Sequence, residues 1–355
     1  MRISNRILTL GVAAALASAS VWAQPTQNSA ATADDPAGRI TNGRIAWVEW
    51  VYPDGGLSIL TAAPDGSDVR QVTSPDPAAG VFDSHPAWTE DGSAIVFERD
   101  MDVQDVSFLY RIDADGGGLK ALGDCTNLCL GNVFPAAGPD GRIAYIKFIG
   151  PVLPSGEATS GGIWIMNANG THEVQVTQKN LPTGSEDRKP TWSPDGKRLA
   201  FTRMNNSTDE PYGRQAIFVT NVDGSEQQRL TPWQMDANSA DWSPDGQLIL
   251  FTSHEDPFTG PTVSEHLYTM RPDGSDMKRV VPAGLADPDD GNGRFSPDGK
   301  KIIFVHTKIT RNFYDWWLYE MNLDGSNVTL VRHNEAYGIG NGGQYVDNPT
   351  WGTHR

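Results

Sequence analysis

The amino-acid sequence predicts an all-β protein, a six-bladed β-propeller with four-stranded blades. The prediction depends first on two turn motifs that interleave along the 355-residue chain, each returning after roughly fifty residues. It depends also on composition, because 37 Gly and 24 Pro are typical of many short strands joined by tight turns. Four short strands per repeat of this period indicate a propeller blade.

Both turn motifs combine Pro, Asp and Gly. In such turns Pro presets φ, the Asp side chain hydrogen-bonds the backbone, and Gly takes the left-handed conformation. The first motif, "SPDG" and its variants, contains Asp91, Asp140, Asp195, Asp245 and Asp298; the second, "DGS" and its variants, contains Asp65, Asp115, Asn169, Asp223, Asp273 and Asp324. We therefore expect these residues to form turns, and we do not interpret the acids as catalytic carboxylates.

The first and last segments of the repeat region complement one another. "NPTWG" (residues 348–352) matches the start of a unit but is not followed by a turn motif, and "GRIAWVEW" (residues 43–50) matches the middle of a unit but has no start before it. We therefore expect the C-terminal strand to complete the first blade, with Trp351 beside Ile45 to Val48. This pairing would close the ring and leave no free sheet edge. The propeller would occupy residues 41–355.

The phrase "WSPDGKRLAF…IFVTNVDGSEQQRLT" (from Trp192) resembles the TolB-like, WD40-like (PD40) repeat of bacterial exported propellers, and the resemblance covers residues 41–355. It implies the propeller fold. The third repeat, "FPAAGPDG", departs from the pattern because it has no Trp. The N-terminal α/β domain of TolB itself is expected to be missing, so the resemblance does not imply the Tol–Pal role.

An aromatic residue precedes most of the first turns. The aromatic residues at this repeat position are Trp88, Trp192, Trp242, Phe295 and Trp351. Large aromatic side chains at a fixed repeat position are typical of packing, so we expect them between blades rather than in a binding ladder.

The N-terminus has the pattern of an export signal. Arg2 and Arg6 precede an apolar run, and Val21-Trp22-Ala23 ends in a small residue that suits cleavage. We expect a signal peptide at residues 1–23, a flexible leader at residues 24–40, and a periplasmic or secreted protein. In such an oxidising compartment, Cys125 and Cys129 are expected to form a local disulfide.

The net charge of −16 argues against nucleic acid and anionic membranes as partners. The sequence also contains no GxSxG or HExxH motif. Whether the chain is an enzyme stays open, although a binding role is favoured. No cofactor is expected, apart from a weak Ca²⁺ site in "DPDDGNG" (residues 287–293).

Long, varied loops are expected on the face opposite the two turn motifs, and such loops often carry binding residues. Two rings of residues border this face near the axis. The inner ring contains Asp83, His85, Asn132, Phe134, Asp187, Lys189, Ala237, Ser239, Asp290, Asn292, Asp347 and Asn348; the outer ring contains Glu49, Arg99, Lys147, Arg203, Ser253 and His306. The rings either satisfy each other as ion pairs or form a polar funnel for a ligand.

The favoured function is a non-catalytic protein- or peptide-binding scaffold. The expected binding residues are Asp83, His85, Asp187, Lys189, Asp290 and Asn292, with Phe258, Phe313, Tyr314, Trp316 and Trp317 as aromatic anchors. The alternative is a carbohydrate-active enzyme, similar to a polysaccharide lyase, acting on an anionic polysaccharide. In that case His85 or His306 would be the base, and Arg99, Lys147 and Arg203 would stabilise the developing charge.

Overall fold

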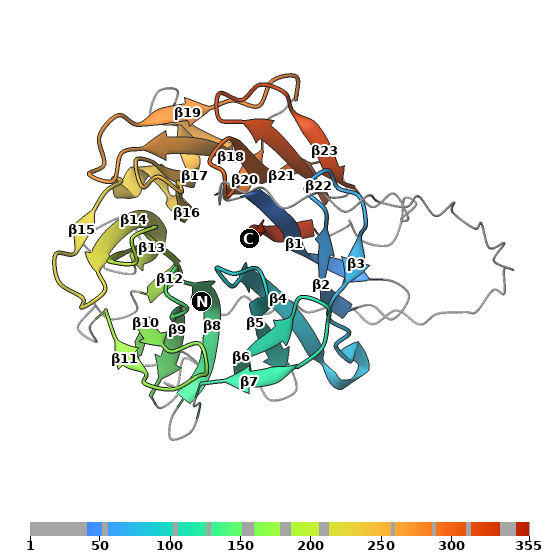
Figure 1. Cartoon of the computed structure of the whole chain (residues 1–355). Helices are drawn as coiled ribbons and strands as arrows, with labels where there is room; N and C mark the ends of the chain where they lie inside the picture. Colours follow the sequence, from blue (N-terminus) through green and yellow to red (C-terminus); the bar gives the residue numbers. More distant parts are fainter. Residues whose placement is uncertain are drawn as a thin grey trace, which may run out of the picture.

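The structure, a computed structural model, describes residues 41–51, 56–101, 106–123, 125, 129–150, 160–177, 186–205, 213–256, 260–285, 289–309, 314–333 and 346–354. In these residues strands stand radially around a central axis (Figure 1). The prediction of an all-β propeller is therefore confirmed. The predicted signal peptide and leader lie outside the described residues. Among the described residues, no helix is long and apolar enough to span a membrane.

Four sheets contain four strands each. The first has the order β24 (Val346–His354), β1 (Thr41–Val51), β2 (Gly56–Ala62), β3 (Arg70–Gln71). The second consists of β12 (Glu186–Trp192), β13 (Arg198–Asn205), β14 (Arg214–Asn221) and β15 (Gln228–Arg229). The third consists of β16 (Ala237–Trp242), β17 (Ile249–Asp256), β18 (Gly260–Met270) and β19 (Lys278–Val280). The fourth consists of β20 (Asp290–Phe295), β21 (Lys301–Ile309), β22 (Tyr314–Asn322) and β23 (Thr329–Arg332).

The remaining sheet has eight strands. Its first half is β4 (Val81–Trp88), β5 (Ala94–Met101), β6 (Val106–Asp113) and β7 (Lys120–Leu122); its second half is β8 (Cys129–Ala137), β9 (Ile143–Ile149), β10 (Ser160–Met166) and β11 (Val174–Gln175). One parallel pair, Ser107 with Gly131, joins the halves.

The prediction of six separate four-stranded sheets therefore needs correction, since the described residues form four such sheets and one larger one. The reason is the close approach of two backbones. A Cβ built at Gly131 would lie 3.5 Å from the amide nitrogen of Ser107, an ordinary contact distance. The pairing therefore follows from the paths of the two strands and not from the absence of a side chain at Gly131.

The predicted partner of Trp351 is confirmed. Strands β1 and β24 pair antiparallel, with Ile45 opposite Trp351. The Trp351 indole N–H donates to the Gly43 carbonyl at 3.2 Å, and the ring packs in a buried cluster with Trp47 and Val331. The first sheet is thus completed by a strand from the far end of the chain.

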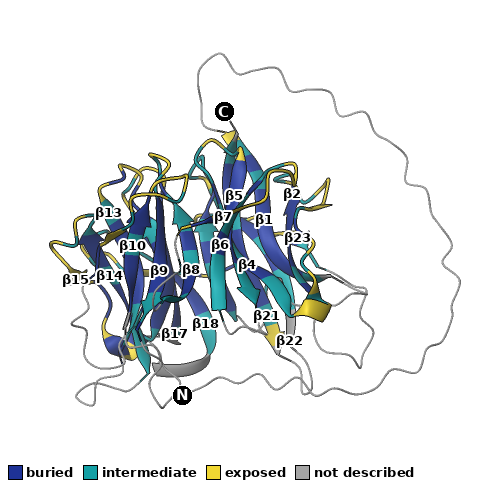
Figure 2. Cartoon of the chain, turned by 90° about the horizontal axis from the view of Figure 1, so that it is seen from below, coloured by how far each residue is buried: buried dark blue, intermediate teal, exposed yellow. Residues whose placement is uncertain are grey.

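The turn motifs behave as predicted. In the turn at Asp195, the carboxylate accepts hydrogen bonds from the Ser193 hydroxyl at 2.7 Å and from the Lys197 amide at 3.1 Å. These bonds hold the pKa of Asp195 below its usual range. Figure 2 shows exposed turn segments mainly along one edge of the disc, with the buried middles of the strands below them.

The repeated aromatic residues pack between neighbouring sheets. All five are buried, with at most 8% of the side chain exposed. The Trp192 indole N–H, for example, donates to the Ala136 carbonyl of β8 at 3.0 Å, and the guanidinium of Arg142 lies 4.8 Å from its ring centroid. The predicted disulfide between Cys125 and Cys129 is also present.

Candidate functional site

Each strand nearest the axis contains one residue with a left-handed backbone. These residues are His85, Phe134, Lys189, Ser239, Asn292 and Asn348, with φ between 48° and 55°. They lie in β4, β8, β12, β16, β20 and β24, where the pairing with the next strand shifts register by a β-bulge. Phe, Lys and Ser seldom adopt positive φ, and such strain is often found at binding sites. Every one of these six residues belongs to the predicted inner ring.

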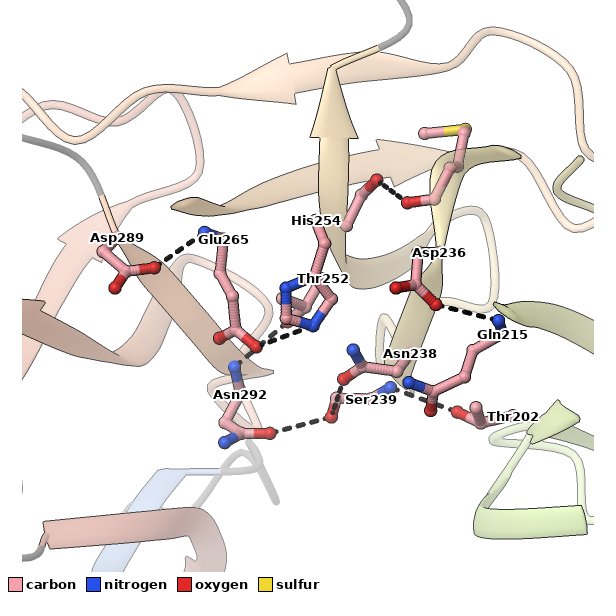
Figure 3. A network of polar contacts seen from close by, with 12 residues as sticks. Thr202, Gln215, Asp236, Asn238, Ser239, Thr252, His254, Glu265, Asp289 and Asn292 are labelled. Carbon is pink, nitrogen blue, oxygen red and sulfur yellow. Dashed lines mark hydrogen bonds and ion pairs between the residues drawn. The ribbon is translucent and has the colours of Figure 1, made fainter. Parts of the chain in front are cut away.

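The preceding repeat holds three of these bulges in place. The amide of Ser239 donates to the Thr202 hydroxyl at 3.2 Å, and the amide of Asn292 donates to the Thr252 hydroxyl at 3.1 Å (Figure 3). The amide of Phe134 donates to the carboxylate of Glu98 at 3.1 Å. Each acceptor belongs to the second strand of the preceding repeat, so the bulge is fixed by contacts between repeats rather than by its own sequence.

A cavity of about 300 Å³ lies at the axis, lined by residues of these six strands. Among the bulge residues, His85, Phe134, Lys189 and Asn348 reach it. Two positions further along each strand, the lining consists of Ala87, Ala136, Thr191, Asp241, Arg294 and Thr350. The cavity therefore has small apolar side chains on one side and charged groups on the other.

On the charged side of the cavity, Lys189 belongs to a hydrogen-bonded cluster that extends behind the lining. The Lys189 ammonium lies 2.8 Å from the Ser239 hydroxyl and 3.2 Å from the amide oxygen of Asn292. The Ser239 hydroxyl donates a hydrogen bond to the side-chain amide oxygen of Asn292 at 2.7 Å (Figure 3). Nearby, burial raises the pKa of Asp241 to about 6, against the opposing effect of Arg294. The structure thus brings together three of the predicted inner-ring residues from three different sheets.

On the opposite side, His85 lies beside two acids that sequence reasoning missed. Its Nδ1 is 2.9 Å from a carboxylate oxygen of Glu98, and its ring contacts the edge of Phe134 with centroids 4.4 Å apart. Burial, followed by the charge of Glu98, raises the pKa of Asp100 to about 6. The signal in the sequence is "FERD" in β5, where the equivalent segments read "FTRM" and "FTSH".

Three outer-ring residues pair with inner-ring acids, as expected if the two rings satisfy each other as ion pairs. Arg99 binds Asp83 and Arg203 binds Asp187, each with its closest contact at 2.6 Å. His306 lies 2.8 Å from Asp290. All three aspartates are almost completely buried. These three side chains are therefore held within the wall rather than directed at a ligand.

The remaining outer-ring residues find partners elsewhere. Lys147 pairs with Glu173 at 2.5 Å, and the Ser253 hydroxyl donates to the Met235 carbonyl at 2.5 Å. Glu49 pairs with Arg332 of β23 at 2.7 Å and raises the pKa of that guanidinium. The inner-to-outer pairing is thus followed in only part of the ring.

The predicted aromatic anchors are not brought together in the described part of the chain. Phe258 and Phe313 lie outside the described residues, and Tyr314 begins β22. Trp316 is half-buried against the core cluster of the first and last sheets. Trp317 stacks on His333 with ring centroids 3.5 Å apart.

Among the described residues, no three His, Cys, Asp or Glu side chains lie close enough together to hold a metal ion. The predicted calcium segment begins with residues 287 and 288, which lie outside that part of the chain. Asp289, which follows them, accepts a hydrogen bond from the Glu265 amide at 2.7 Å (Figure 3).

A family model, the Tricorn protease N-terminal beta propeller domain, matches residues 158–352, which is 195 of the 355 residues. The chain belongs to this β-propeller family. It is also TolB-like. Over 93 residues it is 28% identical to the Tol-Pal system protein TolB of Thioalkalivibrio sulfidiphilus, a stretch covering 26% of this chain and 18% of that protein.

Solved structures show the same fold at low identity. TolB from Acinetobacter baumannii has a TM-score of 0.61 and 20% identity, covering 87% of this chain and 66% of that one. An oligogalacturonate lyase in complex with manganese has a TM-score of 0.53 and 13% identity, covering 81% of this chain and 73% of that one. The chain thus spans less than two thirds of either TolB.

Proposed function

We propose that this protein is an exported, TolB-like propeller that binds a protein or peptide in its axial cavity, which reaches the first-turn residues Glu90 and Pro139, and not through the long-loop face that the sequence favours. Counting each half of the eight-stranded sheet as one blade gives six blades over residues 41–355, closed by β24. Residues 1–23 would direct export and residues 24–40 would form a leader, so that the protein works in the periplasm or outside the cell. The disulfide between Cys125 and Cys129 fits an oxidising compartment.

The observation that carries the proposal is the axial cavity of about 300 Å³. It lies within the size range of sites that enclose small ligands or single side chains. Its wall combines the Phe134 ring and the methyl groups of Ala87 and Ala136 with the Lys189 ammonium. A peptide segment offers both apolar side chains and backbone carbonyls, which match these two kinds of surface.

The rigidity of the wall supports binding rather than catalysis. A side chain locked by contacts with the next repeat loses little freedom when a ligand arrives. The residues that the lyase alternative needs, Arg99, Arg203 and His306, are already paired with buried aspartates. TolB relatives carry the name of the Tol-Pal system, and a protein partner for this chain is proposed by analogy with that name.

Selection from a random peptide library tests the proposal. The protein should enrich peptides that bind the wild type and not an Ala87→Trp variant, because the indole would fill the axial cavity. An Asp276→Ala variant is the matched control, since that residue is exposed near the second turn of another sheet. Peptides that bind all three proteins equally would place binding elsewhere.

The lyase-like alternative has one favourable observation, which is that His85 and Lys189 both line the axial cavity. The fold is shared with the oligogalacturonate lyase. A thermal-shift series with Ca²⁺, Mn²⁺ and acidic oligosaccharides separates the two proposals, because a ligand of the folded state raises the melting temperature. A shift with a uronic sugar that disappears in His85→Gln would favour the enzyme.

A further inference from the structure

A second cavity, of about 240 Å³, lies between the two halves of the eight-stranded sheet. It is bounded by the first-turn residues Thr89 and Ser93 on one side and by Ala137 and Ile143 on the other. Because turn residues form its rim, it is on the face opposite the long loops. It adjoins the axial cavity, with which it shares Ala137.

This cavity lies where the repeat lacks its aromatic residue. Ala137 occupies the position held by Trp88, Trp192, Trp242, Phe295 and Trp351 in the other repeats. Trp192 shows where such a ring goes: it lies over Arg142, and a Cβ built on Gly138 would be 2.8 Å from it. The corresponding residues one repeat earlier are Ser93 and Thr89, and both line the cavity. The cavity is therefore an aromatic slot without its ring.

The wall of the cavity that faces Ala137 also differs from the equivalent wall in the next two repeats. Arg111 of β6 lines the cavity, at the repeat position that is Ile165 in β10 and Val219 in β14. Those two apolar residues pack in the clusters that contain the neighbouring Trp rings. Arg111 instead places a guanidinium there, 2.7 Å from Asp113. The slot thus differs in both of its walls from the slots of Trp192 and Trp242, whereas the remaining repeats have Thr61, Thr269 and Glu320 at the position of Arg111.

We propose that this cavity binds a small planar aromatic molecule of about the size of indole. Its floor is apolar, since Val96 and Ile143 are buried and line it together with Ala137. An apolar cavity of about 150 Å³ is enough to bind benzene. Arg111 supplies a cation for the face of the ring. The same chain stacks Arg142 on Trp192 and Arg198 on Trp242, each at 4.8 Å, in the neighbouring slots.

Calorimetric titration with indole tests the proposal. The wild type should bind one indole, and Ala137→Trp should lower the affinity by about tenfold or more because the side chain fills the slot. Ala137→Phe is a second filling variant in case the larger ring prevents folding, and it copies the residue that Phe295 places in the equivalent slot. Ala137→Ser keeps the volume and should bind within about threefold of the wild type.

The site adjoins the proposed peptide site, since Glu90, Ala137 and Gly138 line both cavities, but it can be tested separately. Ala87→Trp, which fills the axial cavity, should leave indole binding unchanged, since Ala87 does not line the second cavity. The mirror variant Trp192→Ala opens an equivalent slot next to Arg142 and should bind a second indole. Absence of indole binding by the wild type, or equal binding by the wild type and the folded filling variants, would overturn the proposal.

Discussion

Arg203 and Asp187 form a bidentate ion pair inside the wall of the propeller, with Nε 2.6 Å from one carboxylate oxygen and Nη2 3.0 Å from the other. Asp187 is fully buried, and the guanidinium also covers the ring of Phe218. A pair of this kind is difficult to replace one partner at a time, because the remaining charge stays out of water.

Arg203→Met should therefore destabilise the protein strongly. The variant keeps an apolar stem over Phe218 but leaves the Asp187 carboxylate unpaired, which costs about 3 kcal/mol in the free energy of unfolding. Urea unfolding measures the loss. Lys278→Met is the matched control, because its pair with Asp276 is exposed and worth less than about 1 kcal/mol. Equal losses in the two variants would contradict the assigned role of the buried pair.

Asp100 should make stability depend on pH in a known direction. Its pKa is raised to about 6 by burial and then by Glu98, above the unfolded value of about 3.9. The folded protein therefore holds this proton more tightly, and the free energy of unfolding falls as pH rises from about 4 to about 6. Asp100→Asn should melt at a higher temperature than the wild type at pH 7 and at a similar temperature near pH 4.

Asp91→Asn provides the opposite case for that experiment. Hydrogen bonds from the Thr89 hydroxyl and the Ser93 amide lower the pKa of Asp91. Its contribution to stability is present at neutral pH and is lost as pH falls below about 4.

A constant difference between Asp100→Asn and the wild type across pH 4 to 8 would show that Asp100 has no raised pKa.

The disulfide should contribute modestly to stability. Cys125 and Cys129 are four positions apart, and closing so short a loop is worth about 2 kcal/mol in the chain-entropy account. Reductant should lower the melting temperature of the wild type and leave that of a Cys125→Ser/Cys129→Ser double variant unchanged. If reductant lowers both equally, the effect does not come from this bond.

Trp351→Ala should weaken the join between β1 and β24. The side chain is buried among Ile45, Trp47 and Val331, and truncating a core Trp costs about 3–5 kcal/mol. Leu330→Ala on β23 of the fourth sheet is the comparison, because that residue is 46% exposed and the loss of its side chain should cost no more than about 0.5 kcal/mol. Denaturant unfolding of both variants would show whether the join limits stability.

The repeat in the sequence was sufficient to predict contacts that depend on the alignment of one unit with the next. Ile45 opposite Trp351 and the pairing of Arg99 with Asp83 follow from strand order and from equivalent positions. The Ser107–Gly131 pair could not be predicted in this way. It depends on how closely two backbones approach, and a repeat pattern contains no information on that distance.

The candidate site was predicted less completely. Left-handed residues are usually Gly, Asn or Asp, yet here they include His85, Phe134 and Lys189. The bulge at Phe134 is held by a hydrogen bond to Glu98 of the preceding repeat, and such a contact gives no sign in the local sequence. Asp241 and Arg294 could have been found, because the equivalent positions in the other repeats are Ala or Thr.

The pairing of β24 with β1 also constrains how the molecule can be made. Trp351 and Gly43, which share a hydrogen bond, are 308 residues apart, so forming this contact carries a large loop-closure entropy. Until β24 has been synthesised and has arrived, β1 presents an unpaired edge. The first sheet can therefore be completed only after the chain has been made as far as β24.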